Sequence, residues 1–347
     1  MVITIKSLRL IAICLLVCLL FTSCIVTQND TATVSVSEDG LAFHFLDVGQ
    51  GDCTLIKTKD SAILIDAGTY ESSNFIVKYL KSVGVEHLNS FIITHPHEDH
   101  MGGAAFLLEY ITTDKVITNG YTDDAYFYEK FVDVVYEQDI AVEVANTDCI
   151  YDFGDFRLKF LSPRIDYEDT NNNSLVAMVT YGEVKALLTG DAEKKVEKNL
   201  IATSDIDADI LKVGHHGSRN GSHDAFIKKV SPSLSVIHCG KDNSYGHPHA
   251  EAVKRLEKAG SQIFRTDELG TIILRTDGKN IYKDNEKLPD NEIISENVEY
   301  TYIGNKKSKV LHTDTCPNLP SEKNSIVFSS RQEAIDNGYK PCGNCEP

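Results

Sequence analysis

Hydrophobic residues come in short runs bounded by turn residues over most of the chain. From residue 41 onward these runs are separated by Gly, Asp, Asn and Ser. Short apolar runs with such boundaries predict β-strands. The predicted strands are residues 41–48, 53–57, 62–65, 90–94, 157–162, 175–181, 185–188, 210–213, 234–238, 262–265 and 271–275.

Longer stretches, with apolar residues three and four positions apart, predict helices between these strands. The predicted helices are residues 73–83, 104–108, 124–136, 193–201 and 250–259. Strands and helices alternate through two successive halves of the chain, without an internal repeat of fixed period. This order predicts an α/β fold in which two sheets form adjacent layers.

The N-terminus has a different pattern. Lys6 and Arg9 precede an apolar run over residues 10–21, shorter than the ~20 residues of a membrane-spanning helix. Small residues then lead to Cys24, so residues 1–23 resemble a lipoprotein signal peptide and Cys24 is the predicted lipidation site. The polar residues 24–40 predict a tether to the extracytoplasmic face of the cell membrane. Ordinary secretion and an uncleaved anchor are the alternatives.

Charge narrows the possible functions. The chain has 34 Lys and Arg against 51 Asp and Glu, a formal net charge of −17. This balance excludes a broad basic surface of the kind that holds nucleic acid. Chemistry on a phosphate group would therefore need local cations, and a bound metal is the natural source.

Potential metal ligands concentrate directly after the predicted strand 90–94. His95, His97, Asp99 and His100 occur within six residues, followed by two glycines that permit a tight turn into the next helix. A turn at a strand end can bring three imidazoles and a carboxylate around a small volume. The spacing predicts a zinc site, because packing alone does not call for three His beside an Asp.

This spacing, His-x-His-x-Asp-His, resembles the signature of the metallo-β-lactamase superfamily. Further motifs in the same order are similar to the metallo-hydrolase domain of the ComEC-like group within it. They lie at residues 45–52, 64–68, 171–176, 188–191, 215–218 and 245–249. The resemblance covers residues 41–278 and implies an αββα sandwich. The large membrane part of ComEC proteins is missing from this sequence.

The resemblance implies a centre with two zinc ions, or manganese in their place. His95 and His97 would hold one ion, while Asp99, His100 and His215 would hold the other. Asp191 would bridge both. His216 is the less favoured histidine of its pair, because the first His of such a turn ligates in related enzymes. No histidine lies between His100 and His215 to complete the first ion, so one or two bound metals remain alternatives.

Several residues are expected to act around these metals. The predicted catalytic residues are Asp99, Asp191 and His247, with His247 protonating the leaving oxygen. The predicted substrate-binding residues are Asn173, Ser174, His216 and His247. Asp47, Asp52 and Asp66 are expected to orient the ligand histidines through hydrogen bonds.

A second small unit is predicted at the C-terminus, beyond a polar linker over residues 279–299. Within residues 300–347, His312 and Cys316 form one close pair and Cys342 and Cys345 another, the arrangement of a structural zinc site. The segment resembles the zinc-binding module of the DNA-repair protein Ada. The alternative is a disulfide between Cys342 and Cys345. Charge does not support nucleic-acid binding by this module.

Together these features predict an exported, zinc-dependent hydrolase that cleaves a phosphoester, with a phosphodiester of DNA as the favoured substrate. Removal of phosphocholine from wall polymers is an alternative, and β-lactam opening is the least favoured one. A non-catalytic binding lipoprotein of a DNA-uptake machinery is the alternative of another class. No protein partner is implied.

Overall fold

A computed structural model describes residues 40–284, 302–313, 316, 319–328, 334–335 and 337–342. The predicted signal peptide, the predicted lipidation site Cys24 and almost all of the predicted tether lie outside the described residues, as does Cys345. Among the residues described, no helix is long and apolar enough to cross a membrane.

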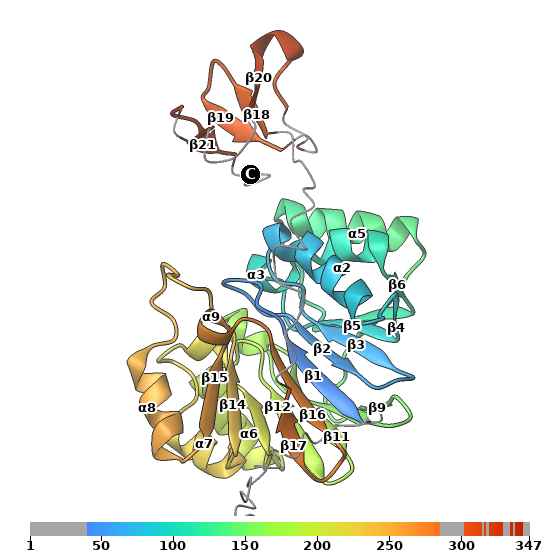
Figure 1. The fold of residues 1–347 in the computed structure, drawn as a ribbon, viewed down its shortest axis with the longest axis vertical. Coiled ribbons are helices and arrows are strands. Elements are labelled where there is room, and N and C mark those ends of the chain that lie inside the picture. Colours follow the sequence, from blue (N-terminus) through green and yellow to red (C-terminus); the bar gives the residue numbers. More distant parts are fainter. Residues whose placement is uncertain are drawn as a thin grey trace, which may run out of the picture. The chain divides into compact units, whose positions relative to one another are not determined.

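The main domain is built on two sheets (Figure 1). The first has eight strands, and its first half is antiparallel while β3, β5, β7 and β8 run parallel. Its strand order is β17 (Ile281–Lys283), β16 (Ile272–Thr276), β1 (Leu41–Phe45), β2 (Thr54–Lys57), β3 (Ala62–Ile65), β5 (Ser90–Ile93), β7 (Lys115–Thr118) and β8 (Ala141–Val144).

The second sheet has seven strands and the same mixture of directions. Four strands, β12 to β15, run parallel, and the remainder are antiparallel. Its order is β15 (Gln262–Arg265), β14 (Leu234–Ile237), β13 (Ile210–Lys212), β12 (Val184–Leu188), β11 (Val176–Tyr181), β10 (Arg157–Ser162) and β9 (Ile150–Asp152).

Helices cover the outer faces of both sheets (Figure 1). Those on the first sheet are α2 (Ser73–Ser82), α4 (Ala104–Tyr110) and α5 (Tyr126–Glu137). Those on the second are α6 (Lys194–Thr203), α7 (Asp224–Val230) and α8 (Ala250–Lys258). Two short helices, α3 (Glu98–Met101) and α9 (Thr266–Leu269), follow strand ends.

Strand β3 shows why the sequence adopts this layering. Ile63 and Ile65 face the apolar layer between the sheets, while Leu64 faces the helices and packs in the cluster that contains Ile76 and Leu80. A strand that is buried on both faces needs a continuous apolar run, because successive side chains point to opposite sides. The predicted αββα sandwich is therefore confirmed.

The predicted strands and helices are all present, although several boundaries differ. The first strand ends at Phe45 rather than Val48, because the chain turns there toward Gly49. The sequence analysis missed β7, β8, β9 and α7, whose patterns are short or half exposed. It also placed residues 281–283 in a linker, whereas β17 extends the first sheet through them.

The C-terminal module has a four-stranded sheet with its own small core. The strand order is β20 (Ser325–Phe328), β18 (Tyr302–Asn305), β19 (Val310–His312) and β21 (Lys340–Pro341). Its core contains Leu311, Phe328, Ala334 and Tyr339.

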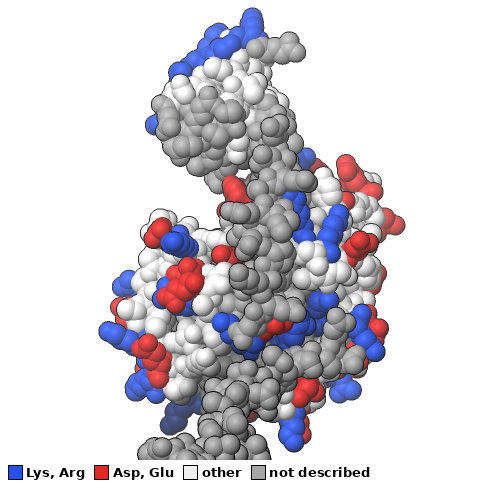
Figure 2. Space-filling model, viewed as in Figure 1, with Lys and Arg blue, Asp and Glu red and all other residues white. Residues whose placement is uncertain are grey.

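Charged side chains of both signs are interspersed on the face of the main domain in Figure 2. The described part of the module, taken by itself, carries a row of lysines at one end. Lys306, Lys307 and Lys309 are exposed in its hairpin turn. Backbone hydrogen bonds join this turn to Asn324 and to Lys340. A local basic end therefore exists in a chain whose net charge is negative.

Candidate metal centre

The predicted ligands converge beyond the carboxyl ends of parallel strands. Strand β5 leads to His95, and the short helix α3 carries Asp99 and His100. In the other sheet, β12 leads to Asp191 and β13 leads to the turn His215–Gly217. Parallel strands present their carboxyl ends at one edge, and ligands in α/β folds bind there. The fold thus gathers residues that are far apart in the sequence.

Four residues offer ligand atoms that all lie within 4.8 Å of one another: Asp99, His100, Asp191 and His216. The Nε2 atom of His100 lies 3.3 Å from Oδ1 of Asp191. The Nε2 atom of His216 lies 3.0 Å from Oδ2 of Asp99 and 3.7 Å from Oδ2 of Asp191. Asp99 is partly exposed and opens this group to solvent, while the other three are buried.

Opposite charges shift the pKa values in this group. Burial alone would lower the pKa of His100, but the carboxylates of Asp191 and Asp66 raise it well above its ordinary value. The carboxylates of Asp191 and Asp52 likewise outweigh burial at His216, and its pKa rises to about 10. Burial would raise the pKa of Asp191, yet the two imidazoles hold it well below its usual range. The carboxylates are therefore ionised at neutral pH and able to bind a cation.

Two buried atoms in the group, Nε2 of His100 and Oδ1 of Asp191, face each other at 3.3 Å as an ion pair but have no hydrogen bond to a described residue. Such unsatisfied atoms are uncommon in a folded interior and need a reason. Imidazole nitrogen and carboxylate oxygen are preferred ligands of zinc and are also compatible with manganese. The four residues therefore fit a divalent metal ion.

His95 and His97 form a pair beside this group. Nε2 of His95 lies 3.1 Å from Nδ1 of His97, and the ring of His95 stands 4.1 Å from that of His100, measured between centroids. Burial lowers the pKa of His95 well below its ordinary value, so its ring is already neutral, whereas His100 and His216 would each release a proton when a metal binds. The pair stands where the resemblance places the first metal.

Both of the consecutive histidines turn Nε2 toward Asp191. His216, which was ranked second, directs Nε2 at Asp99 and Asp191 and belongs to the group of four. The Nε2 atom of the predicted ligand His215 is 3.8 Å from Oδ2 of Asp191, and its Nδ1 lies 2.8 Å from the Glu193 carboxylate. His216 therefore joins His215 as a candidate ligand.

An unusual backbone turn carries these two histidines. His215, His216 and Gly217 have φ values of 48°, 51° and 77°, three left-handed residues in succession. Such residues turn the chain sharply, so both rings approach Asp191. A Cβ on Gly217 would lie 2.6 Å from Cβ of Pro248. Only glycine fits this position.

Asp66 fixes the orientation of His100. The backbone N–H of Thr94 donates to Oδ1 of Asp66 at 2.7 Å, and the Thr94 hydroxyl donates to Oδ2 at 2.8 Å. Nδ1 of His100 lies 2.8 Å from that same Oδ2. A carboxylate on Nδ1 leaves Nε2 as the ligand atom and sets the plane of the ring. The expected orienting role of Asp66 agrees with this geometry.

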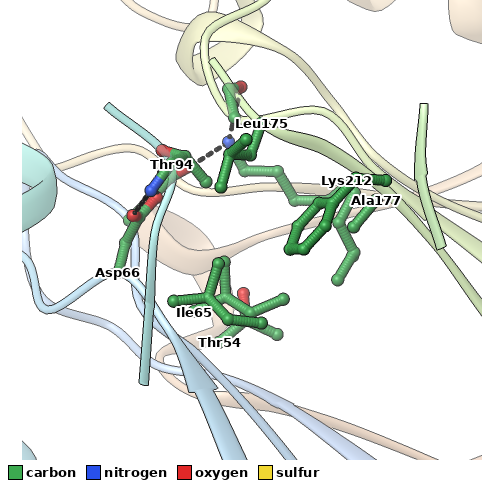
Figure 3. A pocket seen from close by; sticks show the side chains of 12 residues that line it. Thr54, Ile65, Asp66, Thr94, Leu175, Ala177 and Lys212 are labelled. Atoms are coloured by element: carbon green, nitrogen blue, oxygen red, sulfur yellow. Dashed lines mark hydrogen bonds and ion pairs between the residues drawn. The ribbon is translucent and has the colours of Figure 1, made fainter. Parts of the chain in front are cut away.

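Asp52 makes a second such contact and draws in a lysine. Nδ1 of His216 donates to the backbone carbonyl of His238 at 3.2 Å, and Oδ1 of Asp52 lies 3.3 Å from the same nitrogen as an ion pair. Oδ2 of Asp52 pairs with the ammonium of Lys212. Lys212 is buried and also donates to the carbonyl of Gly190 at 3.2 Å. In Figure 3, Lys212 enters the pocket from the second sheet while Asp66 faces it from the first. Lys212 thus links Asp52, which lies beside His216, to Gly190, the residue before Asp191.

The sequence analysis missed Lys212 and also His238. His238 is fully buried with Nδ1 3.5 Å from Oδ1 of Asp52, and burial lowers its pKa to about 3. Both residues occur in or directly after apolar strands. A charged residue inside an otherwise apolar run was a usable signal for Lys212, because lysine is almost never fully buried without a partner.

The predicted substrate contacts Ser174 and Asn173 have structural partners instead. The Ser174 hydroxyl accepts the backbone N–H of Asp191 at 3.1 Å and lies 3.2 Å from Nδ1 of His95. It therefore supports two metal-site residues. The side-chain amide of Asn173 is occupied on both sides by the backbone of Tyr167, at 2.9 and 2.7 Å. The substrate-binding role of Asn173 is not supported, because its polar atoms are committed.

Asp47 does not join the network around the ligands. Its Oδ1 accepts the backbone N–H of Gly49 at 3.3 Å and so shapes its own turn. Burial raises the pKa of its carboxyl group. The expectation that Asp47 orients a ligand histidine is therefore corrected: among the three aspartates, Asp52 and Asp66 have this geometry.

His247 lies at the rim of the site. Its ring centroid is 5.5 Å from that of His215 and 6.0 Å from that of His216. Partial burial and the nearby cationic imidazoles lower its pKa to about 4. A ring with this pKa is neutral at pH 7 and can donate an N–H hydrogen bond, but the predicted role as proton donor is not favoured.

The C-terminal module contains a separate group of ligands. His312, Cys316 and Cys342 are buried, with ligand atoms within 4.8 Å of one another. Nδ1 of His312 lies 3.2 Å from Sγ of Cys316. This combination of sulfur and imidazole suits a structural zinc ion. Cys345, the predicted fourth ligand, lies outside the described residues, and no disulfide joins the cysteines that are described.

Comparisons with known proteins agree with this division. The chain matches the family model of the metallo-beta-lactamase superfamily over residues 46–241 and the metal binding domain of Ada over residues 295–347. Among solved structures, the metallo-beta-lactamase fold protein YhfI from Bacillus subtilis aligns over 69% of this chain and 100% of its own, with 14% identity and a TM-score of 0.49.

Curated relatives include two competence proteins. ComE operon protein 3 of Bacillus subtilis (strain 168) is 32% identical over 251 residues, which are 66% of this chain and 32% of the relative. Competence protein ComA of Neisseria gonorrhoeae is 30% identical over 242 residues, 69% of this chain and 33% of the relative. The chain thus spans about a third of the length of these relatives. With its superfamily match over more than half its length, the chain belongs to the metallo-β-lactamase superfamily.

Proposed function

We propose that this protein is a metal-dependent phosphodiesterase that acts on nucleic acid, most directly on DNA. The observation that carries the proposal is the group Asp99, His100, Asp191 and His216, which combines metal-ligand chemistry with an opening to solvent at Asp99. His95 and His97 stand beside it as ligands for a second ion. Similarity to competence proteins favours DNA over other phosphoesters.

Zinc or manganese bound at these residues would supply charge stabilisation and a hydroxide at neutral pH. The protein's own residues would prepare the site. Asp66 and Asp52 hold His100 and His216 with Nε2 toward the centre. His247, at the rim, would donate an N–H hydrogen bond to a phosphate oxygen of the substrate.

The negative net charge is compatible with a polyanionic substrate if the attraction is local. Divalent ions at the site would provide positive charge where the scissile phosphate binds. The chain as a whole, at −17, would repel DNA at long range, so association should be slow at low ionic strength.

We further propose that a lipid on Cys24 anchors the protein on the extracytoplasmic face of the membrane.

The test is hydrolysis of bis-p-nitrophenyl phosphate and of DNA by the purified protein supplied with zinc or manganese. Wild-type protein should cleave both, and Asp191→Asn should lose at least 100-fold in kcat/KM, since removing such a contact costs a few kcal/mol. Asp133→Asn, an exposed aspartate on α5, is the matched control and should be unchanged. A panel with RNA, phosphocholine esters and nitrocefin covers the other hydrolases of this fold. Cleavage of nitrocefin or phosphocholine esters alone would overturn the proposal.

A further inference from the structure

An exposed aromatic ring stands at the rim of the site. The side chain of Tyr245 is 66% exposed. One face of the phenol lies against His247, with ring centroids 5.7 Å apart and planes 17° from parallel. His247 in turn adjoins His215 and His216. A single imidazole thus separates this ring from the metal-site turn.

The loop that carries Tyr245 is held in place by side-chain hydrogen bonds. The Asn243 amide donates to the carbonyls of Gly240 and His247, at 2.8 and 2.6 Å, and accepts the backbone N–H of His247 at 3.0 Å. Gln50 accepts the N–H of Gly240 at 3.1 Å, which ties the loop to the first sheet. The exposed ring therefore loses little conformational entropy when a ligand covers it.

A second imidazole and a nearby arginine continue this rim beyond His247. The His249 ring is 4.9 Å from that of His247, and its Nδ1 accepts the backbone N–H of Arg219 at 3.2 Å. The Arg219 side chain is 58% exposed and 4.0 Å from Glu251, a surface contact that contributes little. Exposed aromatic faces and cationic side chains are the two elements that hold single-stranded nucleic acid, through base stacking and phosphate contact.

We propose that Tyr245 stacks with an unpaired base next to the scissile phosphate, so that the site selects single-stranded nucleic acid. This inference rests on the proposed phosphodiesterase function and names its substrate class. The bases of a duplex are already stacked and paired, and freeing one costs a few kcal/mol. A substrate such as a phosphocholine ester has no flat ring to place against the tyrosine. Tyr245 is thus a specificity residue that contacts substrate.

The experiment compares a single-stranded oligonucleotide with one of the same length that has abasic positions, and with the corresponding duplex. Tyr245→Ala should raise KM for the normal single strand about 10-fold, which is within the worth of one stacked base. Tyr245→Phe, which keeps the ring, should stay within about twofold of wild type. Tyr136→Ala, at an 86% exposed tyrosine on α5, is the matched control and should have no effect.

Abasic DNA separates stacking from a general structural effect. Wild-type protein should bind abasic DNA as weakly as Tyr245→Ala binds normal DNA, and the Tyr245→Ala substitution should not weaken binding of abasic DNA further. Fluorescence anisotropy with a non-hydrolysable phosphorothioate strand measures the ratio of wild-type to variant affinity without turnover. Equal affinity of wild type and Tyr245→Ala for the normal strand would overturn the inference. If wild type binds and the ratio holds while no phosphodiester is cleaved, the proposed function fails and the stacking contact stands.

Discussion

Oδ1 of Asp52 lies 3.3 Å from Nδ1 of His216, and the other carboxylate oxygen pairs with the buried ammonium of Lys212. The contact orients a ligand histidine from behind, and the lysine compensates the charge of the carboxylate. Burial would raise the pKa of Asp52, but Lys212 and His216 hold it well below its ordinary value. The metal site therefore depends on a charge network that reaches into the space between the sheets.

Replacement of the lysine tests this network. Lys212→Met should destabilise the protein by about 3–5 kcal/mol, because Asp52 would keep a buried charge without its cation. Urea unfolding of the metal-free protein measures the change. Lys115→Met breaks the exposed pair with Glu143 and should cost less than about 1 kcal/mol. Equal effects of the two variants would show that the Lys212 pair is no more than a surface-like contact.

The contact of Asp52 with His216 predicts a change in metal affinity. Asp52→Asn keeps the shape of the side chain but weakens its hold on Nδ1, so affinity at the main site should fall by about 10- to 100-fold. Competition with a chelator measures it. The C-terminal module, with its own ligands, should retain its ion. An unchanged affinity at the main site would contradict the orienting role.

The two consecutive histidines are distinguishable by substitution. His216→Gln should remove the metal held with Asp99, His100 and Asp191, whereas His215→Gln should lower its affinity less, because His215 lies outside that group of four. Metal content after dialysis is the measurement. Greater loss of metal in His215→Gln would contradict the place of His216 at the main site.

His44 gives a prediction for acid stability. It is buried on β1, with Nδ1 2.7 Å from the Tyr79 hydroxyl, and burial lowers its pKa from 6.5 to about 3. The unfolded chain binds this proton at higher pH than the folded one, so stability is complete above pH 6.5 and falls as the pH drops. By pH 5 the loss should reach about 2 kcal/mol.

Chemical unfolding at pH 7 and pH 5 tests this proton linkage. His44→Asn should lack the loss of stability that comes from protonation of His44, whereas Tyr79→Phe should keep this loss, since the His44 imidazole remains. The same pH dependence in wild type and His44→Asn would show that His44 does not carry the effect.

Much of the fold followed from the sequence because its signals are local. Buried strands such as β3 are continuous apolar runs, and the cluster from His95 to His100 lies within six residues. Strands β8 and β9 escaped detection because they lie at sheet edges, where exposed side chains remove the apolar pattern.

The finer geometry of the site could not be predicted in this way. The place of His216 in the group of four depends on three left-handed residues, which no spacing rule encodes. The partners of Lys212 come from segments that are far apart in the chain and meet only after the two sheets pack. Asn173 belongs to a recognisable motif, yet its amide is used by the neighbouring loop.

Metal content per chain, determined by mass spectrometry on the intact protein, tests the central claim most directly. The account predicts at least one ion beyond that of the C-terminal module. Asp191→Asn should lose the additional metal and Cys342→Ser only the module's ion. A single ion per chain that disappears in Cys342→Ser and persists in Asp191→Asn would contradict it.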